Sequence, residues 1–199
     1  MASIRKQEVV IFAGPNGSGK STLTGILKPA MVYINADDIK SSLHCSDMEA
    51  AVLAEQQRER YLFEKNDFCF ETVLSTDRNL KLLQKAKEAG YFLRCYYVLT
   101  CSPIINILRV NSRIADGGHS VPEEKIVSRY KRAVQFIPKL ISICDICHIY
   151  DNSGDSMFRI FKKRKTRFFC DPNQFWSRSA IEKLTGIHEF EQMNLNIAH

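Results

Sequence analysis

Residues 9–22 read VVIFAGPNGSGKST, and this stretch decides the fold. The apolar residues 9–13 predict a buried strand, and residues 21–27 have the pattern of a helix. The loop between them, residues 14–21, fits the phosphate-loop pattern G-x-x-x-x-G-K-[ST] in the strand–loop–helix context that this pattern requires. The stretch therefore predicts a nucleoside triphosphate site within an α/β fold.

Each residue type in this loop has a physical task. Glycines let the backbone fold around phosphates with its N–H groups pointing inward, and the helix N-terminus adds a partial positive charge. Lys20 is expected to bridge the β- and γ-phosphates of ATP, and Ser21 to hold Mg²⁺. The predicted nucleotide-binding residues are Gly14, Pro15, Asn16, Gly17, Ser18, Gly19, Lys20, Ser21 and Thr22.

Length and composition indicate one globular domain without membrane contact. The 199 residues are 45% hydrophobic and 25% charged, which is ordinary for a globular protein. No apolar run is long enough to cross a bilayer, and the first eight residues, MASIRKQE, lack the apolar core of a signal peptide. We expect a cytoplasmic protein with a single domain over 1–199, made of a core over about 8–153 and a C-terminal hairpin and helix over about 155–199.

The seven cysteines indicate a reduced interior. They are odd in number, scattered and mostly flanked by apolar residues, unlike a disulfide framework. Residues 144–148, CDICH, match the pattern of c-type haem attachment, but this segment reads as a buried strand and haem attachment requires export. A redox CxxC should open a helix, and a zinc site needs a second ligand pair.

Short apolar runs alternate with amphipathic stretches, which predicts βαβ units and a parallel sheet. Further strands are expected at 31–34, 68–72, 91–99 and 143–150. Further helices are expected at 47–65, 77–89, 103–115 and from Pro122 onward. Segments 157–161 and 166–170 predict a hairpin, followed by a closing helix over 172–184. The predicted fold is a three-layer P-loop NTPase fold with a mainly parallel sheet, a helical lid, and a small C-terminal hairpin plus helix.

Missing motifs narrow the class of P-loop protein. The sequence contains no NKxD element for reading guanine, no ABC-type signature, and no strand that ends in the Asp-Glu pair of a motor ATPase. A small-molecule kinase is the class that best fits the remaining pattern. Its acceptor hydroxyl must lie in line with the γ-phosphate, at the carboxyl ends of the strands.

Three carboxylates are expected at that edge of the sheet. Asp37 and Asp38 follow the second strand, and Glu71 lies near the end of the third. One of the two aspartates is predicted to be the general base that accepts the proton of the hydroxyl. The alternative is that either aspartate caps the segment 39–41 as a helix N-cap.

Four arginines are candidates for stabilising charge on the transferred phosphoryl group. Arg109 and Arg113 lie four residues apart on one predicted helix, and Arg129 and Arg132 lie on the next. The turn between the two helices, residues 116–119, is DGGH, so the pair is predicted to form a lid. Arg113 is the first choice because it lies closest to the turn, although each arginine could also be ordinary surface charge.

Four elements in this order resemble the zeta-toxin-like kinases, in particular a compact bacterial branch labelled predicted ABC-type ATPase. They are FAGPNGSGKST at 12–22, INADDI at 34–39, FET at 70–72 and GGHSVPE at 117–123. The resemblance covers about residues 8–153. It implies ATP-dependent phosphorylation of a small-molecule hydroxyl, which in zeta toxins belongs to UDP-N-acetylglucosamine, and an antitoxin protein as partner.

The resemblance also implies residue roles. Asp37 matches the catalytic base, Glu71 a substrate-binding carboxylate and Arg113 a phosphate-clamping lid arginine, with Lys20 as the catalytic lysine. Where better-known toxins carry a second lid arginine, this chain has a Gly-Gly-His turn, so His119 or Arg129 would take that place. The further substrate-side candidates are Asp38, Thr72, Arg109, His119 and Arg129. After Glu71 the chain runs TVLS at 72–75, unlike the glycine-rich version that contacts the sugar nucleotide, so the acceptor stays open.

The basic stretch 159–167, RIFKKRKTR, supports an alternative. Such a run is usually a solvated hairpin tip, but it can also bind phosphate-rich ligands or nucleic acid. A polynucleotide or nucleotide kinase is therefore the second functional hypothesis. The third is a nucleotide-gated binding module without enzymatic activity.

Overall fold

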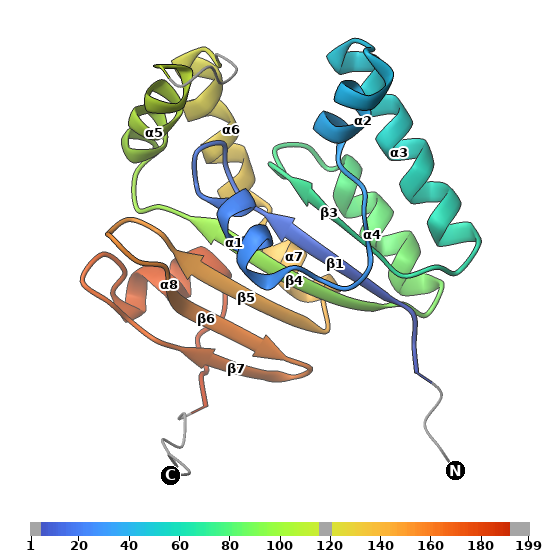
Figure 1. The fold of residues 1–199 in the computed structure, drawn as a ribbon. Coiled ribbons are helices and arrows are strands. Elements are labelled where there is room, and N and C mark those ends of the chain that lie inside the picture. Colours follow the sequence, from blue (N-terminus) through green and yellow to red (C-terminus); the bar gives the residue numbers. More distant parts are fainter. Residues whose placement is uncertain (1–4, 116–120, 192–199) are drawn as a thin grey trace.

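The computed structural model describes residues 5–115 and 121–191, in which strands and helices alternate along most of the chain (Figure 1). The strands are β1 (Glu8–Ala13), β2 (Val32–Tyr33), β3 (Phe68–Thr72), β4 (Phe92–Leu99), β5 (Ile146–Asp151), β6 (Phe158–Arg164) and β7 (Arg167–Cys170). The helices are α1 (Lys20–Leu27), α2 (Ala36–Leu43), α3 (Asp47–Phe63), α4 (Arg78–Glu88), α5 (Pro103–Ala115), α6 (Glu123–Gln135), α7 (Ile137–Ile143) and α8 (Arg178–Thr185).

The seven strands form one sheet in the order β2-β3-β1-β4-β5-β6-β7. The first five strands in this order pair in parallel, while β5–β6 and β6–β7 are antiparallel. The α/β fold with a mainly parallel sheet and a C-terminal hairpin is thus confirmed. Strand β1 lies between β3 and β4, so the loop that follows it leaves the sheet near its middle.

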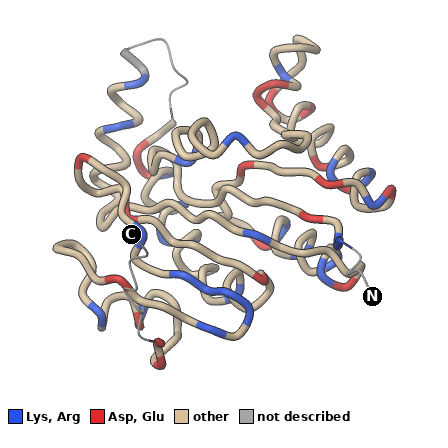
Figure 2. The backbone as a smooth tube through the Cα atoms, turned by 60° about the horizontal axis from the view of Figure 1, so that its bottom comes forward, with Lys and Arg blue, Asp and Glu red and all other residues tan. Residues whose placement is uncertain are grey.

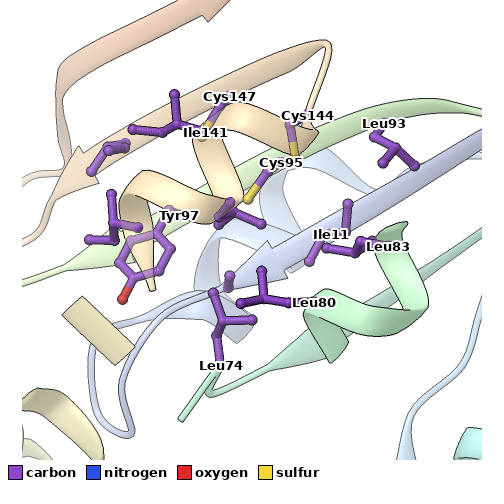
Figure 3. Packing of buried hydrophobic residues seen from close by; sticks show 14 of the residues in the cluster. Ile11, Leu74, Leu80, Leu83, Leu93, Cys95, Tyr97, Ile141, Cys144 and Cys147 are labelled. Atoms are coloured by element: carbon purple, nitrogen blue, oxygen red, sulfur yellow. The ribbon is translucent and has the colours of Figure 1, made fainter. Parts of the chain in front are cut away.

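The two faces of the sheet are covered unequally. On one face, α4, α7 and α8 pack onto the strands and bury the larger core cluster, with Leu83, Ile141 and Ile181 as one contribution from each helix (Figure 3). On the other face, Leu23 of α1 packs against Val10, Phe12 and Val98 in a much smaller cluster. At β1, the second face of the sheet is therefore covered by one short helix, α1.

Two helices that the sequence pattern did not predict separately are α2 and α7. Helix α2 begins right after Asn35, whose side-chain oxygen accepts a hydrogen bond from the Asp37 N–H at 3.1 Å. Asn35 is therefore the N-cap, and the alternative in which Asp37 or Asp38 caps this segment is wrong. Both aspartates lie in the first turn of α2.

The chain after α6 also differs from prediction. Residue 143 ends α7, and β5 begins only at Ile146, because Asp145 is held at the strand entrance by hydrogen bonds with the Leu93 backbone at 2.9 Å. Helix α8 begins after Ser177, whose hydroxyl accepts a hydrogen bond from the Ala180 N–H at 3.2 Å. Residues 172–177 are therefore outside the helix that was expected to start at Pro172.

The basic stretch 159–167 is mostly strand and only partly a tip. Strand β6 continues to Arg164, which leaves only Lys165 and Thr166 in the turn. The Lys163 side chain is 9% exposed, and its ammonium donates to the Ile141 carbonyl at 2.5 Å. Figure 2 shows basic residues gathered along this hairpin. Side chains of a strand point alternately to its two faces, so one of these lysines is buried. The expectation of a solvated hairpin tip does not account for this burial.

All seven cysteines are free, as expected. Cys95, Cys144 and Cys147 lie side by side in the core (Figure 3), where burial and hydrogen bonds to the other two thiols raise the pKa of Cys95. His148 lies on the opposite face of β5 and contacts the ring of Tyr96. The sheet therefore separates the histidine of the CDICH segment from its cysteines, in agreement with the rejection of a haem-attachment site.

This burial predicts the thiol reactivity of the native protein. With 5,5′-dithiobis(2-nitrobenzoic acid), the exposed Cys101 should react fast, half-buried Cys45 and Cys170 more slowly, and the four buried cysteines only on unfolding. Burial, aided by the charge of Glu71, also raises the pKa of Cys69 to about 11, which lowers its thiolate fraction further. Cys101→Ser should remove the fast phase, and a fast phase that survives this change contradicts the packing described above.

Candidate functional site

The loop between β1 and α1 is fixed by close backbone packing. The Gly14 N–H donates to the Thr72 carbonyl of β3 at 3.1 Å. A Cβ atom on Gly14, which has φ of 141°, would lie 2.0 Å from the carbonyl oxygen of Val98 in β4. At Gly17, with φ of 74°, it would lie 2.6 Å from the Asn106 carbonyl oxygen. Glycine is required at both positions by conformation and by space.

Two asparagines that the sequence did not point to, Asn106 and Asn152, hold the loop by hydrogen bonds to its backbone carbonyls. The Asn106 amide donates to the Asn16 carbonyl at 2.6 Å, and the Asn152 amide donates to the Ser18 carbonyl at 2.8 Å. Asn106 is completely buried and accepts a hydrogen bond from the Thr100 hydroxyl. The only signal in the sequence is that Asn152 directly follows β5 and that Asn106 lies in the first turn of the helix after β4.

Lys20 lies at the start of α1 under this loop. Its ammonium donates to the Pro15 carbonyl at 2.9 Å. Burial lowers the pKa of Lys20 to about 8, the charge of Glu71 raises it in part, and the charge of Arg113 lowers it further. Without a bound ligand, the negative charge of Glu71 therefore balances the positive charge of Lys20 only in part.

The loop also contains a polar donor that fits a phosphate group. The buried Ser18 hydroxyl has no hydrogen-bond partner among the described residues. Together with Lys20 and the positive end of α1, the Ser18 hydroxyl is a donor suited to anionic oxygens. The residues present therefore fit the triphosphate that the motif predicts.

Glu71 contacts the first turn of α1. One carboxylate oxygen accepts a hydrogen bond from the Ser21 hydroxyl at 2.9 Å, and the other accepts one from the Thr24 hydroxyl at 2.7 Å. Burial, followed by the charge of Glu71, raises the pKa of Tyr33 nearby. Glu71 therefore lies beside the hydroxyl that the motif assigns to the metal ion. Thr24, one turn beyond Lys20, belongs to no part of the motif and was not predicted.

Asp37 and the loop line the same cleft, of about 520 Å³. Lys20 and Ser21 line it from the start of α1, Asp37 from the start of α2, Glu71 from β3 and Arg113 from α5. Asp37 is exposed, which suits a group that exchanges protons with a substrate. The structure thus brings together five residues that the sequence nominated from four separate segments.

The other nominated residues on the acceptor side divide into two groups. Arg109 and Asp38 are not among the described residues that line this cleft. Thr72 is included, but its hydroxyl oxygen already accepts hydrogen bonds from the Asn79 amide at 2.8 Å and the Leu74 N–H at 2.9 Å. Arg129 lines a neighbouring cavity of about 450 Å³ that also contacts Asp37. His119 is outside the described residues.

The turn of the basic stretch, Lys165 and Thr166, lies away from the candidate site, whereas Arg159 at the start of the stretch pairs with Tyr150 near the carboxyl end of β5. The Lys165 N–H donates to the Asp145 carbonyl at 2.7 Å, beside the amino end of β5, whereas the loop leaves the carboxyl end of β1. The turn of the β6–β7 hairpin therefore lies at the opposite edge of the parallel sheet from the phosphate loop. This position does not favour a nucleic acid that contacts both.

Within residues 5–115 and 121–191, no group of three or more His, Cys, Asp or Glu side chains is arranged to hold a metal ion. Over the same residues, no helix has the length and apolarity needed to cross a membrane.

Solved structures with the same fold include a complex with ATP and a toxin–antitoxin system. A complex of AvrRxo1-ORF1 and ORF2 with ATP matches with a TM-score of 0.68 at 15% identity, over 91% of this chain and 64% of that chain. The chain therefore spans less than two thirds of the AvrRxo1 chain. A structure of the PezAT chromosomal toxin–antitoxin system of Streptococcus pneumoniae matches with a TM-score of 0.61 at 17% identity, over 96% of this chain and 82% of that one.

Sequence comparison gives the family. An uncharacterised protein of Haemophilus influenzae is 26% identical over 133 residues, which cover 64% of this chain and 95% of that protein. The family model described as Zeta toxin matches residues 2–163, well over half of the chain. This match confirms the resemblance seen in the motifs and the prediction of a P-loop kinase. The chain belongs to the zeta toxin family.

Proposed function

We propose that this protein transfers the γ-phosphate of ATP to a hydroxyl group of a small molecule, with Asp37 as the general base. The observation that carries the proposal is that Asp37 lines one cleft together with Lys20 and Ser21. A base and a phosphate-binding loop in one cleft leave room between them for an acceptor hydroxyl. A protein that only switches conformation with its nucleotide has no need of such a base.

On the donor side, the loop N–H groups and Lys20 would hold the phosphates. A phosphate beside Lys20 supplies the negative charge that this buried ammonium lacks, so binding returns its pKa toward the ordinary value. Ser21 would hold Mg²⁺, with Glu71 orienting it through their hydrogen bond of 2.9 Å. When bound, the ion would neutralise charge on the phosphate oxygens.

On the acceptor side, Asp37 would accept the proton of the hydroxyl as the new O–P bond forms. The bond from the γ-phosphorus to the oxygen that bridges it to the β-phosphate breaks, and ADP leaves with that bond's electron pair. Arg113 lines the cleft from α5 and is close enough to Lys20 to lower its pKa. It is placed to stabilise negative charge on the phosphoryl group during transfer.

Family membership supports the phosphotransfer and suggests an acceptor and a partner. We propose UDP-N-acetylglucosamine or another sugar nucleotide as the first acceptor to test, on the basis of the family resemblance. The name of the PezAT system describes that protein as part of a toxin–antitoxin pair, and the AvrRxo1 structure contains ATP. By analogy we propose that this protein uses ATP and is a toxin restrained by an antitoxin protein.

Removal of the Asp37 carboxylate tests the proposed base. Asp37→Asn should lower the rate of phosphotransfer by about 10²- to 10⁴-fold while leaving ATP affinity within a few-fold of wild type. Transfer of labelled phosphate from ATP to acceptors in a metabolite extract, followed by mass spectrometry, measures this. Glu64→Gln, which removes an exposed carboxylate at the end of α3, is the matched control. Equal transfer by the Asp37→Asn variant and wild type would remove Asp37 as base.

The lowered pKa of Lys20 predicts a pH dependence of nucleotide binding. Only the ammonium form pairs with phosphate, and binding raises its pKa above the free value of about 8. Affinity should therefore be full below pH 8 and fall by up to about tenfold per pH unit above it. Titration with a fluorescent ATP analogue measures this, and Lys20→Met should bind weakly without this decline. An affinity that stays constant in wild type to about pH 9.5 contradicts the low pKa.

The toxin proposal makes a separate prediction about growth. Induced expression of the wild-type chain in a bacterial host should arrest growth, because the enzyme would consume an essential metabolite. Expression of Asp37→Ala at the same level should not. If both strains grow equally well, the toxin proposal fails, although phosphotransfer measured with the purified protein could still hold.

A further inference from the structure

Arg58 on α3 lines the cleft, and the charge of Glu55 offsets the burial of its guanidinium only in part. Its guanidinium carbon lies 5.0 Å from the centroid of the Phe70 ring, so the group lies over the middle residue of β3. Its Nε atom is buried and has no hydrogen-bond partner among the described residues. Burial lowers the pKa of Arg58, but a guanidinium stays charged in a protein. An unsatisfied donor on a charged group is costly and indicates a missing anion.

The carboxylate of Glu55 attracts Arg58 but is already paired with another arginine. Glu55, one turn earlier on α3, forms an ion pair with Arg78 at 3.1 Å. Arg78 begins α4 and lines the same cleft, and its charge lowers the pKa of Arg58 further. Two guanidinium groups thus share one carboxylate at this end of the cleft. One positive charge remains unbalanced there.

This cationic pair is separate from the groups that serve the triphosphate. Lys20 begins α1 and Arg113 lies on α5, whereas Arg58 lies on α3 and Arg78 at the start of α4. Figure 1 shows α5 and α3 on opposite sides of α1. The donor phosphates, held by the loop, therefore leave the Arg58 side of the cleft to the acceptor.

We propose that the acceptor carries an anionic group, a phosphate or a carboxylate, that binds to Arg58 with the support of Arg78 and so directs its hydroxyl toward Asp37. This inference rests on the proposed kinase function and narrows its substrate class to anionic alcohols. The planar guanidinium can bind two oxygens of such a group at once. Arg58 would thus select and position the substrate and would have no part in the proton transfer itself.

The first test measures binding at Arg58 without any transfer. With the loop filled by Mg²⁺ and a non-hydrolysable ATP analogue, inorganic phosphate should raise the melting temperature of wild type but not of Arg58→Gln. Arg60→Gln is the matched control, since Arg60 lies on the same helix but is largely exposed. Arg58→Lys keeps the charge but loses the fork, and should keep part of the shift. An equal shift in Arg58→Gln and wild type, or no shift in wild type, overturns the inference.

The second test uses transfer and separates the two sources of negative charge. A metabolite extract is divided by anion exchange, and a part of the retained fraction is treated with phosphatase, which is removed before the assay. Wild type should phosphorylate a compound from the retained fraction only; loss of the acceptor after phosphatase treatment identifies a phosphate, and its survival a carboxylate. Arg58→Gln should lower kcat/KM for it by about 10- to 100-fold, mainly through KM.

The outcomes of the second test are distinguishable. A product from the unretained fraction, or equal kcat/KM in the Arg58→Gln variant and wild type, overturns the inference while the kinase proposal stands. No transfer from any fraction by wild type defeats the kinase proposal instead, and the phosphate-binding test then decides on Arg58 by itself. The melting temperature of Arg58→Gln without ligand shows whether the variant is folded.

Discussion

The close approach of the Gly14 backbone to β4 is the constraint on which the site depends. Any side chain at this position would collide with the Val98 carbonyl. The same glycine donates to the Thr72 carbonyl of β3, so the loop is fastened to both neighbours of β1 at the point where it leaves the sheet. Asn106, in the first turn of α5, and Asn152, just after β5, then hold the next turn of the loop. The loop is thus set in shape by the sheet before any phosphate arrives, which reduces the entropic cost of binding.

The register of the sheet also places the carboxylate that serves the donor side. Ala13 pairs with Thr72, so Glu71 stands one residue before the end of β3, beside the first turn of α1. There it accepts hydrogen bonds from Ser21 and Thr24. Asp37, in contrast, stands on α2, which follows a strand of only two residues and is fixed at its start by Asn35. The donor side is therefore part of the rigid sheet, while the proposed base belongs to a more weakly anchored helix pair.

Local signals explain what the sequence could predict. The bounds of β3 and α5 agree with the residues predicted, because a dense apolar run and Pro103 mark them without help from distant contacts. Helix α2 was missed because it has only eight residues and three apolar ones, Ala36, Ile39 and Leu43, none of them fully buried. Thr24, Asn106 and Asn152 were missed for a different reason. Their roles depend on which strands become neighbours, and this order, β3-β1-β4-β5, is not written in any local pattern.

The role of Arg58 could not be predicted from the sequence for the same reason. On the sequence it is one of several charged residues in the long predicted helix, and its task depends on Phe70 from another element and on the fact that Glu55 pairs with Arg78. Once folded, the cleft has an incompletely compensated cation at each end, Lys20 on the donor side and Arg58 on the other. A molecule with one anionic end is attracted to both, but the triphosphate fits the loop better because only the loop offers an array of backbone N–H groups. With the loop occupied, the remaining cation orients the second substrate, and the hydroxyl of an acceptor held there extends into the space beside Asp37.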